Sequence, residues 1–158
     1  MRLELGCGVR PTPGYVHLDR IAHAGHVDVA HNLDVLPWPF EDGQFEEILA
    51  LDVMEHLTQP VNVWLDECWR ILKPNGVLVM RLPSWDNHAV FWRDTTHQRA
   101  FHEESFCFWD TAHPLWEYYG KFYYAEAGRW WVVESVTRVN PDSRYGIGDL
   151  RYVLRKRA

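Results

Sequence analysis

The chain has 158 residues, enough for one folded domain and short for two, and we expect a single domain over residues 1–158. Its hydrophobic fraction of 47% permits a buried core, but no stretch approaches the ~20 apolar residues of a membrane helix. The net charge of −6 disfavours a nucleic-acid partner, and residues 1–6 lack the apolar segment of a signal peptide, which together favour a cytosolic (cytoplasmic) protein.

The first half of the chain reads as short strands that lead up to one helix. Strands are expected at residues 3–5, 15–19, 27–29, 45–51 and 77–82. The prolines of residues 37–40 exclude regular structure there, because each restricts its neighbour and lacks an N–H donor. Apolar residues recur at helical spacing over 61–72, and Pro74-Asn75-Gly76 ends that helix. Buried strands joined by a helix are typical of a parallel, doubly wound sheet.

The second half is richer in aromatic and β-branched residues, as in residues 116–124 and 129–139, which Glu126-Ala127-Gly128 separates. Residues 150–154 form a last strand after the Gly146-Ile147-Gly148 turn. All three segments are expected to be antiparallel strands that complete one edge of the sheet. The predicted fold class is therefore α/β, with a doubly wound, mostly parallel sheet and antiparallel C-terminal strands.

A glycine turn and an acid mark two neighbouring strand ends. Gly6 and Gly8 follow the first strand, and glycine lets a ligand approach the backbone because it has no Cβ. Asp19 ends the next strand, where a carboxylate can accept hydrogen bonds from ribose hydroxyls. Ligands of doubly wound sheets bind at these carboxyl ends. Taken singly, however, the two glycines are also typical of an ordinary tight turn, and Asp19 is also typical of a solvated loop carboxylate.

Several segments, in this order, resemble the motifs of class I methyltransferases that depend on S-adenosylmethionine (SAM). They are Leu3-Glu4-Leu5-Gly6-Cys7-Gly8, Tyr15-Val16-His17-Leu18-Asp19, residues 32–45, Asp52-Val53-Met54-Glu55-His56-Leu57 and residues 67–76. Their order over the first half of the chain is more specific than any one motif. The resemblance implies a Rossmann-like sheet, SAM as the cofactor and methyl transfer to an oxygen or nitrogen acceptor, expected to be a small molecule.

The resemblance also implies which residues bind the cofactor. Gly6 and Gly8, together with Glu4 and Cys7 of the same motif, would place the methionine moiety and the ribose against the backbone. The resemblance further implies that Asp19 binds the ribose hydroxyls and that Asp34 faces the adenine amino group. Leu33 or Val35 would pack on the adenine ring, and Leu51 and Asp52 would lie near the sulfonium.

Two departures from the family pattern concern the start of the domain. The chain begins at the first strand, so we expect a minimal version of the fold that lacks the N-terminal helices of many relatives. Only seven residues separate Gly8 from Val16, too few for the usual crossover helix, so Arg10 would supply charge near the carboxylate of the cofactor. A sheet face left uncovered tends to find a partner, which predicts a homodimer or burial beneath the aromatic second half.

Two segments are candidates for the acceptor side of the reaction. His56 follows the fourth strand, near the expected methyl group, and histidine is the commonest base near neutral pH. Asp94, His97 and Arg99 place an acid, a base and a cation in one loop, in a segment that resembles one in small methyltransferases of bacteria and phages. The alternatives are a packing or capping role for His56 and a salt-bridge network that holds the loop.

The sequence favours no metal site and leaves two rival functions. The histidines and cysteines lack the spacing of a zinc motif: His23, His26 and His31; His97 and His102; Cys7, Cys68 and Cys107. A nicotinamide (NAD)-dependent oxidoreductase is disfavoured because Pro11 stands where Gly-x-Gly-x-x-Gly has its third glycine, and no helix follows. A non-catalytic protein that only binds SAM remains open.

Overall fold

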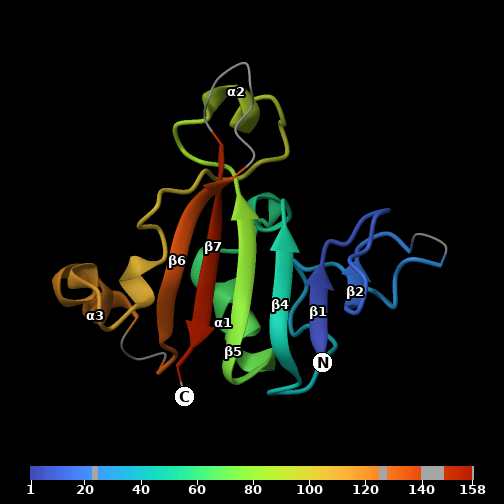
Figure 1. Ribbon diagram of the computed structural model, residues 1–158, viewed down its shortest axis with the longest axis horizontal. Coiled ribbons are helices and arrows are strands. Elements are labelled where there is room, and N and C mark those ends of the chain that lie inside the picture. The colour runs from blue at the N-terminus through green and yellow to red at the C-terminus, as the bar shows by residue number, and fades with distance from the viewer. Residues whose placement is uncertain (23–24, 125–127, 140–147, 158) are drawn as a thin grey trace.

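The structure, a computed structural model, describes residues 1–22, 25–124, 128–139 and 148–157, with every side chain among them except those of residues 89 and 90. These residues form one seven-stranded sheet in the order β3-β2-β1-β4-β5-β7-β6 (Figure 1). Its strands are β1 (Arg2–Leu5), β2 (Val16–Asp19), β3 (Val29–Ala30), β4 (Phe45–Leu51), β5 (Leu72–Leu82), β6 (Trp131–Val139) and β7 (Asp149–Lys156). Strands β1 to β5 pair in parallel, whereas β7 pairs antiparallel with both β5 and β6. The expected fold class is confirmed.

The strand order reverses between β1 and β4. From β1 the chain runs outward to β2 and β3, and it then returns to β4 and β5 on the other side of β1. The register pairs Leu3 with Ile48 and Leu5 with Ala50, so β1 and β4 are direct neighbours. Ligands of doubly wound sheets bind outside the carboxyl ends at such a reversal. The topology therefore places the candidate site just beyond the ends of β1 and β4.

The core lies on one face of the sheet, beneath α1 (Val61–Ile71). The helical spacing of its apolar residues turns Trp64 and Leu65 toward the strands, and both are fully buried. Burial of a side chain such as Leu65 contributes about 1.5–3 kcal/mol. The aromatic second half packs on the same face, where the Phe106 ring lies 6.0 Å from Trp64 and 4.9 Å from Tyr152 between centroids. Short turns complete the fold: η1 (Met54–His56), α2 (His88–Phe91), η2 (Cys107–Trp109), η3 (Trp116–Gly120) and α3 (Lys121–Tyr123).

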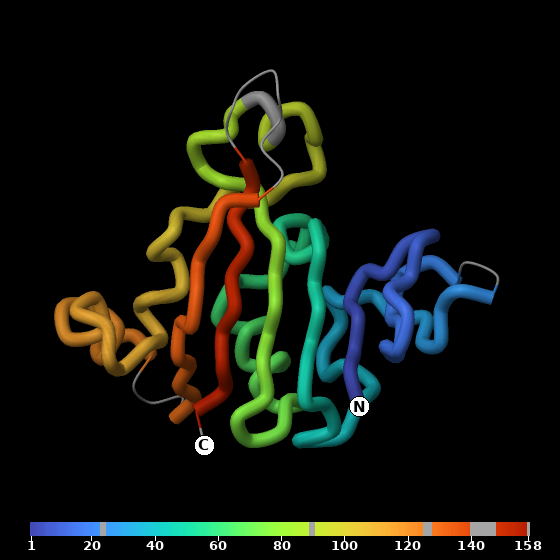
Figure 2. Tube along the Cα trace, in the orientation of Figure 1, coloured from blue at the N-terminus to red at the C-terminus, as the bar shows by residue number. Residues whose placement is uncertain are grey.

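The opposite face of the sheet is covered by no helix of the described residues, and Figure 2 shows its central strands unobstructed from that side. Leu49, Val79 and Val153 form a row across β4, β5 and β7 there, and Leu49 and Val153 stay partly exposed. The aromatic second half packs with α1 on the other face. Burial of this face beneath the aromatic segment was therefore a wrong expectation for the described residues, and the homodimer stays a prediction.

Residues 116–123 are helical, which corrects the expectation of a strand over residues 116–124. They form a π-helical turn, η3, that continues into α3. Glu117 and Lys121 pair four residues apart with 2.8 Å between Oε2 and Nζ, and Tyr119 stacks on Tyr123 at the same spacing. Aromatic residues favour strands, but side chains four residues apart meet only on a helix. The contacts at helical spacing overruled the local propensity.

Two strand boundaries also differ from the sequence expectation. Leu72 ends α1 and at once pairs with Phe45 in the sheet, so β5 starts before the turn that was expected to precede it. The Pro74-Asn75-Gly76 turn lies inside the strand as an irregularity, with Asn75 at φ 63°. The strand expected at residues 27–29 is shifted toward Val29–Ala30. The helix, the strand at 45–51 and the strands that became β6 and β7 are confirmed.

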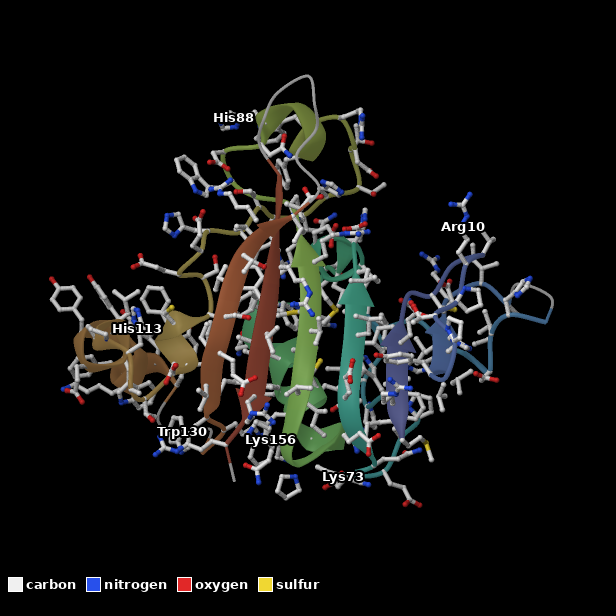
Figure 3. The ribbon with its side chains drawn as sticks, in the orientation of Figure 1. Arg10, Lys73, His88, His113, Trp130 and Lys156 are labelled. Carbon is white, nitrogen blue, oxygen red and sulfur yellow. The ribbon has the colours of Figure 1, made fainter. Side chains whose placement is uncertain are left out.

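The connection between β1 and β2 contains no helix, as its length predicted. Arg10 lies in this loop, is exposed, and projects from the outer rim of the molecule (Figure 3). The turns expected around residues 126–127 and 146–147, and His23, lie outside the described residues. None of the helices within the described ranges is long and apolar enough to cross a membrane.

Candidate active site

Two adjoining cavities open at the carboxyl edge of the parallel strands. The smaller cavity, of about 300 Å³, lies beyond β1, β2 and β3, and the larger, of about 510 Å³, lies beyond β4 and β5. Asp52 and His56, which follow β4, line both cavities. Ligands in the two cavities would therefore meet at these two side chains.

Asp19 lines the smaller cavity with a carboxylate that the loop holds in place. Its Oδ2 accepts a hydrogen bond from the Gly8 backbone N–H at 2.9 Å, and its Oδ1 accepts one from the Ile21 backbone N–H at 3.0 Å. An ionised carboxylate has about four acceptor positions, so about two stay free for hydroxyl donors. The fixed carboxylate therefore suits the two hydroxyls of a ribose.

The two glycines after β1 meet different needs. Both have left-handed backbone, with φ 63° at Gly6 and φ 56° at Gly8, and this conformation favours glycine. A Cβ on Gly6 would lie 2.5 Å from Cγ2 of Val53, whereas a Cβ on Gly8 would have no other heavy atom of the described residues within 4 Å. Gly6 also lines the smaller cavity. Gly6 is thus fixed both by its backbone and by its close approach to the segment after β4.

Glu4 and Cys7 hold the loop and line neither cavity. The Glu4 carboxylate accepts hydrogen bonds from the backbone N–H and the hydroxyl of Thr12, both at 2.7 Å. Cys7 is 7% exposed, and burial, followed by the nearby Asp19 and Glu4 carboxylates, raises the pKa of its thiol to about 11. The hydrogen bonds of Glu4 and the burial of Cys7 thus help to hold in place a loop that has no crossover helix.

The segment after β3 lines part of the smaller cavity, but not every residue expected to contact the adenine lies there. Leu33 and Asp34 line the smaller cavity, whereas Val35 is 54% exposed and lies outside it. The Asp34 Oδ1 already accepts hydrogen bonds from the backbone N–H of Thr58 at 2.8 Å and of Gln59 at 3.3 Å. Its carboxylate is therefore partly engaged in joining this segment to the loop before α1.

Asn32 also lines the smaller cavity, and sequence reasoning did not single it out. Its side-chain Oδ1 accepts a hydrogen bond from the Asp34 backbone N–H at 3.2 Å, which leaves the amide N–H groups to face other partners. The available signal was its position just after β3, since the same strand-end argument identified Asp19 after β2.

Asp52 stands at the junction of the two cavities in a strained conformation. It has φ 55°, which is uncommon for a residue with a Cβ, and such residues cluster at functional sites. Its two carboxylate oxygens accept from Arg81 in a fork, with 2.7 Å between Nε and Oδ1, and this bond raises the pKa of Arg81. Leu51, the preceding residue, lines neither cavity.

His56 is oriented by a hydrogen-bonded chain that starts at Asp94. The Asp94 carboxylate accepts from the Thr96 hydroxyl at 2.6 Å, and that hydroxyl lies 2.8 Å from Nδ1 of His56. Because the single hydroxyl proton is directed to Asp94, Nδ1 must donate, and the lone pair is left on Nε2. Burial, and then the neighbouring His97, lower the pKa of His56, so its ring is neutral at pH 7.

His97 lies beside His56, with ring centroids 4.7 Å apart, and it lines the larger cavity. Its Nε2 is 4.0 Å from a carboxylate oxygen of Glu55 and 4.0 Å from one of Asp94. Arg99 belongs to the same loop but lines neither cavity. It donates to the carbonyls of Leu57 and Gln59 at 3.0 and 2.8 Å, which fastens this loop to the segment after η1.

Glu55 is a site residue that sequence reasoning missed. It lines the larger cavity and is only 2% exposed, and burial raises the pKa of its carboxyl to about 8. Its backbone carbonyl accepts from the Gln98 N–H at 2.8 Å, which brings the loop of His97 to η1. No sequence signal identified it, because burial here depends on a segment some forty residues away in the chain. Asp149, at the start of β7, also lines the cavity, and burial raises its pKa.

Comparisons with known proteins agree with this geometry. Residues 7–80 match the protein family described as "Methyltransferase domain". A segment of 68 residues is 34% identical to an uncharacterized 37.1 kDa protein in transposon TN4556 of Streptomyces fradiae, covering 43% of this chain. The match spans only 19% of that relative's length.

Solved structures extend the likeness to the whole fold. A putative methyltransferase bound to the Haloferax volcanii Trm112 activator aligns with a TM-score of 0.63 and 16% identity, over 99% of this chain and 82% of the other. The 1,6-didemethyltoxoflavin-N1-methyltransferase of Burkholderia thailandensis, solved with 1,6-didemethyltoxoflavin and S-adenosylhomocysteine, aligns with a TM-score of 0.60 and 19% identity, over 99% of this chain and 71% of the other. At such identities the likeness shows the fold.

The sheet order belongs to an overall fold that this chain shares with solved class I methyltransferases. Residues 7–80, a little under half of the chain, match a methyltransferase domain within that fold, and SAM is the cofactor of that class.

Proposed function

We propose that this chain transfers the methyl group of SAM, held in the smaller cavity, to an oxygen or nitrogen of a small molecule held in the larger one. The observation that carries the proposal is the shared wall: Asp52 and His56 line both cavities. Methyl transfer is an in-line displacement, for which positioning of the two reactants supplies much of the rate. Two cavities that meet at one wall provide that arrangement.

Binding of SAM in the smaller cavity would rest on residues that the structure orders locally. Asp19 would accept hydrogen bonds from the ribose hydroxyls, Gly6 would let the ligand lie against the backbone, and Leu33 would pack on the adenine. The amide of Asn32 suits the polar edge of the ring better than Asp34, whose carboxylate already has two backbone partners. The residues present therefore fit the cofactor.

Bound there, SAM supplies a methyl group on a sulfonium, and transfer breaks the carbon–sulfur bond as the acceptor forms its bond to that carbon. An acceptor hydroxyl or protonated nitrogen must also lose a proton. His56 is suited to take it, because its ring is neutral and the Asp94–Thr96 chain leaves the Nε2 lone pair free. Asp94 and Thr96 are positioning residues in this scheme.

The larger cavity has a composition that restricts the acceptor. Among the described residues, its lining carries the carboxylates of Asp52, Asp94 and Asp149, and the carboxyl of Glu55 with its raised pKa, against the guanidinium of Arg93. Such a lining disfavours strongly anionic acceptors and favours neutral or cationic ones with hydrogen-bond donors. A volume of about 510 Å³ is in the range of small-molecule sites.

Calorimetry of SAM binding tests the first half of the proposal. We expect Asp19→Ala to weaken SAM binding by about 10–100-fold, since hydrogen bonds to a charged group contribute about 1.5–3 kcal/mol. Asp28→Ala is the matched control, because Asp28 is an exposed carboxylate beside the same strand that lines neither cavity. NAD should not bind. Failure of the wild-type protein to bind SAM, or equal losses in both variants, would contradict the cofactor site.

The second half is tested by turnover. Neutral and cationic small molecules with hydroxyl or amine groups would be screened for formation of S-adenosylhomocysteine. SAM binding without any turnover would favour the rival reading, a protein that binds SAM and does not catalyse transfer.

A further inference from the structure

We propose that Glu55, His56 and His97 together bind one divalent transition-metal ion, of the kind represented by Zn²⁺, in the larger cavity. The three residues come from two places in the chain: η1 provides Glu55 and His56, and the loop beyond α2 provides His97. Each offers one ligand atom, and these atoms all lie within 4.8 Å of one another. An ion placed between them would need only small side-chain movements to reach metal–ligand distances of about 2.0–2.2 Å.

Unpartnered buried atoms at the same place point to a missing partner. Oε2 of Glu55 and Nδ1 of His97 are buried and have no hydrogen-bond partner among the described residues. Glu55 is 2% exposed and lines the cavity. Leaving a buried polar atom unsatisfied costs about 1–3 kcal/mol, and more for a charged group. A cation between the carboxylate and the imidazoles would satisfy these atoms.

The histidines are prepared for ligation rather than for ion pairing. The Asp94–Thr96 chain fixes His56 in the tautomer whose Nε2 lone pair is free, and metal-bound histidines almost always donate their other N–H to such a partner. Within the part of the chain that the structure describes, Nδ1 of His97 has no hydrogen-bond partner, and the ion-pair contacts of its Nε2 with Glu55 and Asp94 are 4.0 Å long. Either ring nitrogen of His97 can therefore become the ligand.

The donor set selects the kind of metal. Two imidazoles and one carboxylate suit Zn²⁺ and its first-row neighbours, whereas Mg²⁺ and Ca²⁺ are bound mainly by oxygen ligands. Three protein ligands also leave a coordination position open, as in catalytic zinc sites. Here that position would face the cavity of about 510 Å³ that we assign to the acceptor.

The use of this ion rests on the proposed function, although its binding does not. An ion at this place would hold an acceptor oxygen or nitrogen and lower the pKa of its proton. Nε2 of His56 would then be a ligand, so the role of base that we assign to His56 belongs to the protein without metal. The site departs from the sequence expectation of no metal, because two adjacent residues and a third far along the chain form no recognisable spacing.

Titration of Zn²⁺ into protein freed of metal by a chelator tests the proposal, with calorimetry as the readout and visible absorption of bound Co²⁺ as a second signal. We expect one equivalent to bind. Glu55→Gln and His97→Ala should each weaken binding by more than about 100-fold, beyond the range typical of residues that only support a ligand. Thr96→Val, which removes such a support of His56, should weaken it by about 10–100-fold.

His102→Ala is the matched control, because His102 is half exposed beside Glu103 and Glu104 in the same part of the chain and lines neither cavity. Its Zn²⁺ affinity should equal that of the wild type. Circular dichroism of the metal-free variants distinguishes loss of a metal ligand from loss of the fold. If a variant fails to fold, His56→Gln is tested in its place. Absence of wild-type binding, or unchanged binding in Glu55→Gln and His97→Ala, overturns the proposal.

The same preparations would be titrated with SAM. Glu55→Gln and His97→Ala are expected to lose Zn²⁺ binding and to keep SAM binding. Failure of SAM binding in a wild-type protein that binds Zn²⁺ would instead contradict the proposed function and leave the metal site standing.

Discussion

The smaller cavity is assembled from the ends of neighbouring short strands, whereas the larger one draws on residues spread from Asp52 to Asp149. In the smaller cavity, backbone N–H groups hold the carboxylates of Asp19 and Asp34. In the larger cavity, side chains orient other side chains, and buried atoms of Glu55 and His97 have no hydrogen-bond partner among the residues described. The smaller cavity is thus held mainly by backbone groups, whereas the larger one is held mainly by contacts between side chains.

The largest expected effect tests how tightly the turn after β1 is packed against the segment after β4. Gly6→Ala should destabilise the protein by about 2–5 kcal/mol, because left-handed strain costs about 1–2 kcal/mol and overpacking about 1–3 kcal/mol. The overpacking arises where a Cβ would meet Val53 at 2.5 Å. Urea unfolding measures the loss. Gly8→Ala, with the same backbone strain and open space around it, should lose only about 1–2 kcal/mol.

Equal losses in the two glycine variants would show that Val53 moves aside freely. The turn after β1 would then not be packed tightly against the segment after β4.

The next effect concerns how well the β1–β2 loop excludes reagents without a helix. The pKa of Cys7 is raised to about 11 by burial and by the nearby Asp19 and Glu4 carboxylates, so at pH 8 its thiolate is scarce. Alkylation of native Cys7 by iodoacetamide should be roughly 100-fold slower than that of the unfolded chain, since two pKa units correspond to that ratio. The rate should rise tenfold per pH unit up to about pH 11.

Mass spectrometry of the labelled peptide follows Cys7 separately from Cys68 and Cys107. If the alkylation rate of native Cys7 matched that of the urea-unfolded chain at pH 8, the loop would open readily. The side of the smaller cavity that this loop forms would then not be well ordered.

The smallest expected effect distinguishes the roles of Asp34 and Asn32 in the smaller cavity. Asp34→Ala should destabilise the protein by about 1–2 kcal/mol, because the backbone N–H groups of Thr58 and Gln59 lose their acceptor. It should weaken SAM binding less than Asn32→Ala does. Urea unfolding and calorimetry on both variants check this. A larger loss of SAM affinity in Asp34→Ala would restore the adenine contact that the sequence resemblance implied for Asp34.

The fold was predictable where local pattern and tertiary packing agree. Buried apolar runs gave β4 and most of β5, and helical spacing gave α1, because in these elements the buried face is also the patterned face. The expectation failed at residues 116–124, where aromatic side chains favour a strand in isolation but meet one another at helical spacing. It also could not say which face of the sheet the aromatic half would cover.

The candidate site was predictable to the same extent. Gly6 and Asp19 follow from the ends of adjacent strands, and the structure places both on the smaller cavity. His56 and His97 were named separately, but nothing in the sequence joined them or revealed the burial of Glu55 between them. That junction depends on long-range hydrogen bonds, among them one from the Gln98 N–H to the Glu55 carbonyl, which no residue pattern encodes.

The wall formed by Asp52 and His56 has a thermodynamic consequence. When occupancy of one cavity moves either side chain, the free energies of binding in the two cavities become coupled. Linkage then requires reciprocity. An acceptor that raises the affinity for SAM by some factor must itself bind more tightly by the same factor once SAM is present. A fork such as Arg81 on Asp52 would set how stiff that wall is, and hence how strongly the two ligands sense each other.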